Sequence, residues 1–69
     1  MADLSERLHF LRKERNLKQE ELSEQTGIGY RSYRRYESGE REPTSSTIIA
    51  LADFFGVSAD YLLGRSDEQ

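Results

Sequence analysis

The sequence predicts an all-α fold, a compact five-helix bundle in a single domain. Apolar residues recur at spacings of three or four, which is the period of amphipathic helices, and polar or glycine-containing breaks separate these segments. A chain of 69 residues has room for one modest core and for no large substrate cavity. Because the chain contains no cysteine, neither a disulfide nor a thiolate metal site supports the fold, and helix packing has to hold it together.

The first two helices are expected over residues 5–15 and 18–26. In the first, leucines recur at i, i+4 and i+7 and form one apolar stripe. That stripe consists of Leu4, Leu8 and Leu11. The second is polar on most faces around Leu22, and Gly27 provides its C-terminal stop. Only the first of these helices therefore has a wide apolar face.

A tight turn over residues 27–29 leads into a third helix, expected over residues 30–38. The turn contains one apolar residue, Ile28, which can fill the angle between the flanking helices. Tyr33 and Tyr36 lie at i and i+3 and are expected in the core, with phenol oxygens that reach solvent or phosphate at its rim. The arginines of this segment then lie on its other faces, which makes it the best candidate for a recognition helix.

Two further helices are expected over residues 45–55 and 58–63, after a polar loop that contains the only proline. The apolar positions of the fourth helix are Ile48, Leu51, Ala52 and Phe55. Ser58 is suited to cap the fifth helix, and residues 65–69 are expected to form a frayed tail. This tail is compatible with a natural end and with continuation into a further domain. Two aromatic residues, Phe10 and Phe54, lie off the apolar stripes and are expected to be half-covered; full exposure would indicate a partner surface.

The charge distribution limits the possible functions. The net charge is −3, whereas nucleic-acid-binding domains are usually basic. Residues 1–52 hold nine acidic and nine basic side chains, so the excess of acid lies at the C-terminal end, in residues 53–69. Within the balanced part, residues 30–36 hold three arginines and no acid. A local positive patch can thus exist on a negative molecule. No apolar run approaches the roughly 20 residues of a membrane span, and we expect a cytoplasmic protein.

Several spaced motifs occur in order along the chain. They are Leu17-Lys-Gln-Glu-Glu-Leu-Ser, Gly27, Tyr33-Arg-Arg-Tyr-Glu-Ser-Gly, Glu42-Pro43 and Leu51-Ala-Asp-Phe-Phe-Gly-Val-Ser-Ala-Asp-Tyr-Leu-Leu-Gly. Over about residues 4–64 the chain resembles the phage-repressor and Cro-like helix-turn-helix family, also called the xenobiotic-response-element family. The resemblance implies a lambda-repressor-like five-helix fold and a sequence-specific transcriptional regulator, most simply a repressor, that reads the major groove of double-stranded DNA.

The resemblance also implies which residues meet DNA. The expected base-reading side chains are Tyr30, Arg31, Arg35 and Arg34. For Arg34, a solvated position or a phosphate contact is the open alternative. Arginine suits this role because its planar fork can bond O6 and N7 of guanine together. The expected phosphate contacts are Lys18, Gln19, Ser32, Ser38 and Arg41. Glu40 and Glu42 flank Arg41, a departure from the family pattern that weakens backbone contacts there.

Two structural roles follow from the same resemblance. Arg12 and Glu37 match an ion pair that joins the first helix to the end of the third. A two-fold dimer is implied, with half-sites about 34 Å apart on a palindromic operator. Its interface is expected at Pro43, Val57, Ser58 and Tyr61.

The sequence also bears on two other classes of function, enzymes and protein-interaction modules. The sequence has one histidine, His9, expected to be a surface residue, and no nucleophile elbow, phosphate loop or metal-ligand cluster, so we expect neither an enzyme nor a cofactor or metal. The stronger alternative is a protein-interaction module, such as an antitoxin or antirepressor partner, on the same scaffold. The negative net charge favours it, whereas the three arginines together with Gln19 favour DNA.

Overall fold

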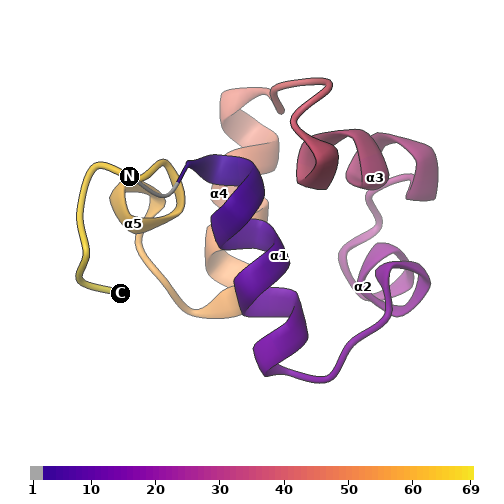
Figure 1. Cartoon of the computed structure of the whole chain (residues 1–69). Helices are drawn as coiled ribbons and strands as arrows, with labels where there is room; N and C mark the ends of the chain where they lie inside the picture. The colour runs from indigo at the N-terminus through magenta and orange to yellow at the C-terminus, as the bar shows by residue number, and fades with distance from the viewer. Residues whose placement is uncertain (1–2) are drawn as a thin grey trace.

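A computed structural model describes residues 3–69, and in this part of the chain it forms five α-helices and no strands (Figure 1). The helices are α1 (Leu4–Glu14), α2 (Gln19–Thr26), α3 (Tyr30–Ser38), α4 (Ser45–Phe55) and α5 (Ala59–Leu62). The expected all-α, five-helix architecture is confirmed. The expected limits of α3 and α4 coincide with those observed. For α1, α2 and α5, an expected end differs from the observed one by at most one residue.

The helices form two groups around α1. Figure 1 shows α1 through the middle of the molecule with α4 behind it, α2 and α3 together on one side, and α5 with the C-terminal tail on the other. Helix α1 packs against α3 and α5, and α4 packs against α2 and α5. The α2–α3 pair therefore forms one edge of the molecule, and its outer surface is covered by no other element of the described chain.

The core consists of side chains from all five helices. Those with almost no exposed surface are Leu8, Leu11, Leu22, Tyr33, Leu51, Phe55 and Leu62. Each contributes roughly 1.5–3 kcal/mol by leaving water. The expected core positions of Tyr33 and Tyr36 are confirmed, but the expectation that both hydroxyls reach the rim is wrong for Tyr33. Its hydroxyl is buried and makes no hydrogen bond within residues 3–69.

Helix ends are fixed by local chemistry that the sequence encodes. The side chains of Asp3, Thr44 and Ser58 accept hydrogen bonds from the backbone N–H groups of Glu6, Thr47 and Tyr61, and so cap α1, α4 and α5. Helix α3 ends at Gly39, whose φ of 83° lies in the left-handed region that favours glycine. Gly39 thus sets where α3 ends and where the following loop begins.

The C-terminal tail is held against α1 and α5. Arg7 is buried, its guanidinium lies 4.1 Å from the ring centroid of Tyr61, and its two terminal nitrogens donate to the Ser66 carbonyl (2.8 Å) and the Asp67 carboxylate (3.0 Å). The Ser58 N–H donates to the Gln69 carbonyl at 2.9 Å. The expected tail has no helix, but it is not frayed, because Arg7 ties it to the bundle.

The two aromatic residues outside the stripes differ. Phe10 is 51% exposed, whereas Phe54 is partly buried and packs edge-on against Phe55 with ring centroids 5.1 Å apart. Between residues 3 and 69, no helix combines the length and the apolar character that crossing a membrane requires.

Candidate nucleic-acid interface

Helix α3 presents its basic side chains outward because its two tyrosines are anchored inward. Tyr33 and Tyr36 are buried against the core, which turns Arg31, Arg34 and Arg35 to solvent. Among residues 3–69, these three arginines take part in no ion pair. Their donors are thus available to an anionic partner.

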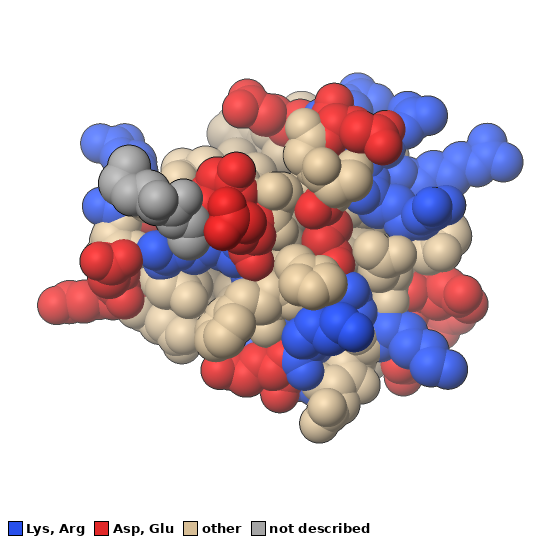
Figure 2. Space-filling view, viewed as in Figure 1, with Lys and Arg blue, Asp and Glu red and all other residues tan. Residues whose placement is uncertain are grey.

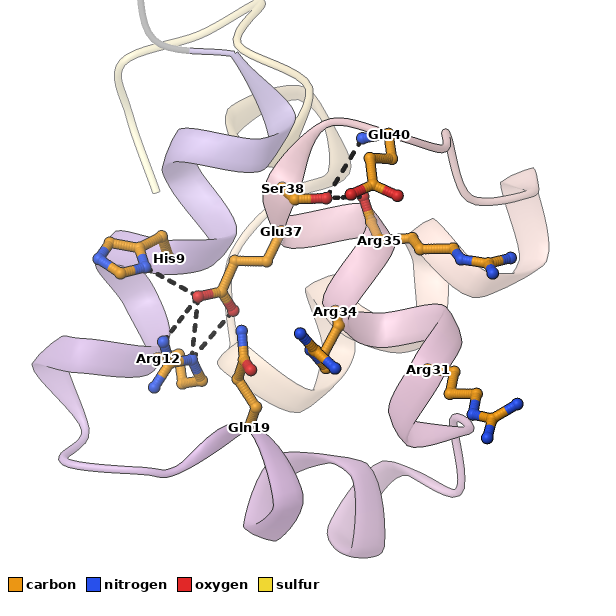
Figure 3. A pocket seen from close by; sticks show the side chains of 9 residues that line it. All are labelled: His9, Arg12, Gln19, Arg31, Arg34, Arg35, Glu37, Ser38 and Glu40. Carbon is orange, nitrogen blue, oxygen red and sulfur yellow. Dashed lines mark hydrogen bonds and ion pairs between the residues drawn. The ribbon is translucent and has the colours of Figure 1, made fainter.

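Three helices surround a shallow hollow beside α3, which we term the arginine hollow. It is lined by His9, Arg12, Gln19, Arg31, Arg34, Arg35, Glu37, Ser38 and Glu40. Figure 3 shows that Arg34 points toward Gln19 inside the hollow, whereas Arg31 and Arg35 point away from it. Four arginines and two glutamates line the hollow, so its formal charge is +2 with His9 neutral. It is therefore suited to bind an anion.

Tyr30 shapes the start of α3. Its ring is 39% exposed, and the Arg34 guanidinium lies 5.6 Å from the ring centroid. A cation over an aromatic face at this distance is attracted to the ring. The contact holds Arg34 on the side of α3 that faces the hollow. Tyr30 thereby limits the directions that Arg34 can take.

Arg12 and Glu37 form a buried bidentate ion pair at the back of the hollow. Arg12 Nε lies 2.9 Å from Glu37 Oε2, and Arg12 Nη2 lies 2.6 Å from Oε1. The remaining Arg12 nitrogen donates to the Leu17 carbonyl at 2.7 Å. The two side chains are 9% and 4% exposed. The pair therefore fixes α1, the α1–α2 connection and the end of α3 relative to one another.

The charged state of this pair is strongly favoured. Burial by itself would raise the pKa of Glu37, but the hydrogen bond from Arg12, then the nearby Tyr33 hydroxyl and His9, lower that pKa to about 2. The hydrogen bond with Glu37 raises the pKa of Arg12. Burial, with the adjacent Glu37 carboxylate, raises the pKa of Tyr33 far above its usual range. At neutral pH the cluster consequently holds a carboxylate, a guanidinium and a neutral phenol.

His9 belongs to this cluster, which the sequence did not indicate. Its Nδ1 lies 2.8 Å from Glu37 Oε1, and its side chain is 55% exposed. The available signal was its spacing: His9 is three residues before Arg12, and residues at i and i+3 share a helix face. His9 is exposed, as expected, and in addition contacts Glu37.

The N-terminus of α2 is less basic than a phosphate site usually is. Gln19 begins the helix, and Lys18 is exposed at its N-cap position. The Lys18 N–H donates to the Glu21 carboxylate at 2.9 Å, and Glu20 and Glu21 both lie in the first turn. The negative charge of these carboxylates partly offsets the positive potential that a helix N-terminus offers to anions. Gln19 lines the hollow, whereas Lys18 does not.

In the loop after α3, two backbone N–H groups are already hydrogen-bonded within the protein. The N–H groups of Glu40 and Arg41 donate to the Arg35 carbonyl at 3.0 and 3.3 Å, and so close the end of α3. The Ser38 hydroxyl donates to the same carbonyl at 3.1 Å. The N–H groups of Glu40 and Arg41 are thus already engaged, and the exposed Arg41 side chain is what this part of the loop offers to a phosphate. Ser32, on the first turn of α3, is half-buried.

The expected dimer residues lie at two separate places. Pro43 precedes α4, whereas Val57, Ser58 and Tyr61 follow it, so the 11-residue helix separates them by roughly 16 Å along its axis. Val57 and Tyr61 are buried in the core, Pro43 is also buried, and only Ser58 is exposed. An interface through these residues would need to be small or to include their exposed neighbours.

The surface is mixed in charge with a local concentration of basic side chains. Figure 2 shows blue side chains gathered on the right of the view, where α3 lies in Figure 1, with acidic side chains beside them and at the opposite end. The surface in this view is not uniformly negative, despite the net charge of −3.

Comparison with known proteins assigns the family. The family model for Helix-turn-helix matches residues 8–62, which include the Arg12–Glu37 pair, the turn and all of α3. The chain belongs to the phage-repressor and Cro-like helix-turn-helix family. A solved structure of the P22 c2 repressor in complex with a synthetic operator superimposes with a TM-score of 0.87 at 27% identity, over 96% of this chain and 100% of that one.

Curated relatives of this family domain are longer proteins. The chain is 40% identical over 63 residues to the uncharacterized HTH-type transcriptional regulator YobD of Bacillus subtilis, covering 91% of this chain and 56% of YobD. It is 40% identical over 62 residues to the cryptic phage CTXphi transcriptional repressor RstR of Vibrio cholerae, covering 90% and 55%. The family domain therefore spans about half the length of these relatives.

Proposed function

We propose that this helix-turn-helix domain is the DNA-binding domain of a transcriptional regulator, most simply a repressor. It binds double-stranded DNA and reads the major groove with α3. The observation that carries the proposal is the outer face of α3, where three arginines that form no ion pair within residues 3–69 flank the arginine hollow. The names of the relatives, among them a phage transcriptional repressor, support the same function. The role is one of binding, not of catalysis.

The orientations divide the arginines between two tasks. Arg31 and Arg35 lie one helical turn apart and point outward, which suits the reading of base edges in the major groove. Arg34 points into the hollow toward Gln19, which favours a phosphate contact for it. Tyr30, at the start of α3, is positioned to contact a sugar or a thymine methyl group. Ser38, Arg41, Lys18 and Ser32 are proposed as further backbone contacts.

We also propose that the domain acts as a two-fold dimer on a palindromic operator. Half-sites one helical turn apart place the two recognition helices about 34 Å from each other. The longest axis of this domain measures 27 Å, which is shorter than that spacing, so any contact between two copies is confined to a narrow edge. Such a dimer is weak without DNA, in agreement with the limited exposure of Pro43, Val57 and Tyr61.

Selection from a random duplex library at about 100 mM salt, followed by a salt titration on the best site, tests the proposal. The expected result is an enriched palindrome whose affinity falls as salt rises. If the folded protein enriches no sequence, the result favours the alternative function, a protein-interaction module. The carboxylates Glu20, Glu21, Glu40 and Glu42, which border the basic face, favour that alternative.

Two substitutions separate base reading from backbone contact. Arg35→Ala is expected to lower the affinity for the selected site by roughly 1–3 kcal/mol and to relax preference at one base pair. Gln19→Ala, the matched control on α2, is expected to weaken selected and random duplexes alike. Equal losses on both duplexes for Arg35→Ala would assign Arg35 to the phosphate backbone.

A further inference from the structure

His9 is held in one tautomer by its neighbour. A carboxylate is an acceptor only, so the 2.8 Å contact between His9 Nδ1 and Glu37 Oε1 requires that Nδ1 carry the proton. Because the pKa of Glu37 is about 2, Glu37 stays ionised above pH 5 and this requirement persists. The ring nitrogen that gains or loses a proton is therefore Nε2, at the exposed edge of the imidazole (Figure 3).

The position of Nε2 matters because His9 lines the arginine hollow from α1. The charged groups that share this hollow with His9 are Arg12 on its own helix, Arg31, Arg34, Arg35 and Glu37 on α3, and Glu40 after α3, while α2 contributes the neutral Gln19. Two further charged groups, Glu6 and Lys13, are one turn away on α1 and both exposed. Protonation of His9 raises the formal charge of the hollow from +2 to +3.

We propose that protonated His9 donates from Nε2 to a DNA backbone phosphate, so that α1 adds a proton-dependent contact to the interface formed by α2 and α3. This inference rests on the proposed function. The contact is available without rearrangement, since Nδ1 remains on Glu37 while Nε2 faces outward. Histidine is the side chain that changes charge between pH 5 and 8, and His9 is the only histidine in the chain.

The test measures duplex affinity and its salt dependence at pH 5.5 and pH 8.0, on the selected site and on a random duplex. Wild-type protein is expected to bind both duplexes about 2- to 5-fold more tightly at pH 5.5, the range measured for one exposed ion pair. The slope of log K against log salt is expected to steepen by about 0.9, because one more phosphate is neutralised. A residue that only supports the fold would leave this slope unchanged.

Two variants isolate the proton. His9→Gln keeps an N–H donor for Glu37 but cannot become charged, so its affinity and salt slope are expected to be the same at both pH values. His9→Lys carries the charge at both, and is expected to bind tightly with the steeper slope throughout. Circular dichroism at each pH verifies that all three proteins are folded.

The outcomes are distinct. If wild type is insensitive to pH, or His9→Gln keeps the wild-type pH dependence, His9 does not contact phosphate, and the proposed function stands. If neither wild type nor His9→Lys binds any duplex while folded, the proposed function fails and this inference fails with it.

Discussion

Glu37 keeps its negative charge although its side chain is almost fully buried. This residue affects both the stability of the fold and the placement of the candidate DNA-binding helix α3. It accepts hydrogen bonds from Arg12 and His9, two side chains of α1, and it lies in the last turn of the helix that carries the outward arginines. Buried ion pairs are poor sources of net stability, but the loss of one partner leaves an uncompensated charge. The pair therefore specifies how α3 sits on α1.

Acid is expected to destabilise the domain through Glu37. Its pKa is about 2 in the folded protein and 4.5 in a free side chain, so the stabilisation is complete above pH 4.5 and is lost as the pH falls toward 2. The full shift corresponds to a loss on the order of 3 kcal/mol in the free energy of unfolding. Urea unfolding at pH 6, 4.5 and 3 measures it.

An NMR titration of the Glu37 carboxyl carbon provides the direct control for this assignment. A midpoint near 4.5 in the folded protein would contradict the prediction.

At the scale of the elements, the caps define where each helix begins, and α4 is the clearest case. The Thr44 hydroxyl accepts from the Thr47 N–H at 3.3 Å at the start of α4. This helix carries Leu51, Ala52 and Phe55 into the core, so its register determines how the α4 side of the bundle closes. A cap at its start thus affects packing well beyond its own turn.

Thr44→Ala is expected to lower the free energy of unfolding by about 1 kcal/mol, because one N–H at the start of α4 loses its acceptor. Ser45→Ala is the matched control, one residue later, exposed, and with no side-chain hydrogen bond among residues 3–69; it is expected to change stability by less than about 0.5 kcal/mol. Thermal or urea unfolding compares the two. Equal effects would show that the Thr44 hydroxyl does not act as a cap.

For the whole molecule, Arg7 links the first helix to the last residues of the chain. Its guanidinium lies over the Tyr61 ring and donates hydrogen bonds to Ser66 and Asp67 of the tail. Asp67 itself is fully exposed, so its ion pair contributes little. The packing of the Arg7 stem and its cation–π contact contribute more.

Arg7→Ala is accordingly expected to lower the free energy of unfolding by about 1–2 kcal/mol. Asp67→Ala, its matched control, is expected to have a much smaller effect, because the Asp67 side chain is fully exposed. Urea unfolding at neutral pH distinguishes them. If Asp67→Ala costs as much as Arg7→Ala, the ion pair and not the packing holds the tail.

The fold was largely predictable from the sequence, because helices are encoded by local pattern. The leucine stripe of α1, the two inward tyrosines of α3 and the glycines after α2, α3 and α4 each act over one or two turns, and the observed helix limits follow them. The residue types of the candidate interface were predictable in the same way. The α2–turn–α3 segment occupies adjacent positions in the chain, so its outward side chains can be read in order.

Contacts between distant parts of the chain were decided only by the tertiary structure. The sequence does not indicate that His9 meets Glu37 or that Arg7 holds residues 66 and 67. Nor does it indicate that the Tyr33 hydroxyl is buried without a hydrogen-bond partner in the described part of the chain. Each depends on how two helices cross, and a crossing angle is set by the packing of whole faces, not by any residue pattern along one helix. The sequence by itself determined five helices, an inward and an outward face for α3, and a local excess of arginine. The tertiary structure decided which of these side chains share one hollow, because only the packed core brings α1, α2 and α3 to the same place.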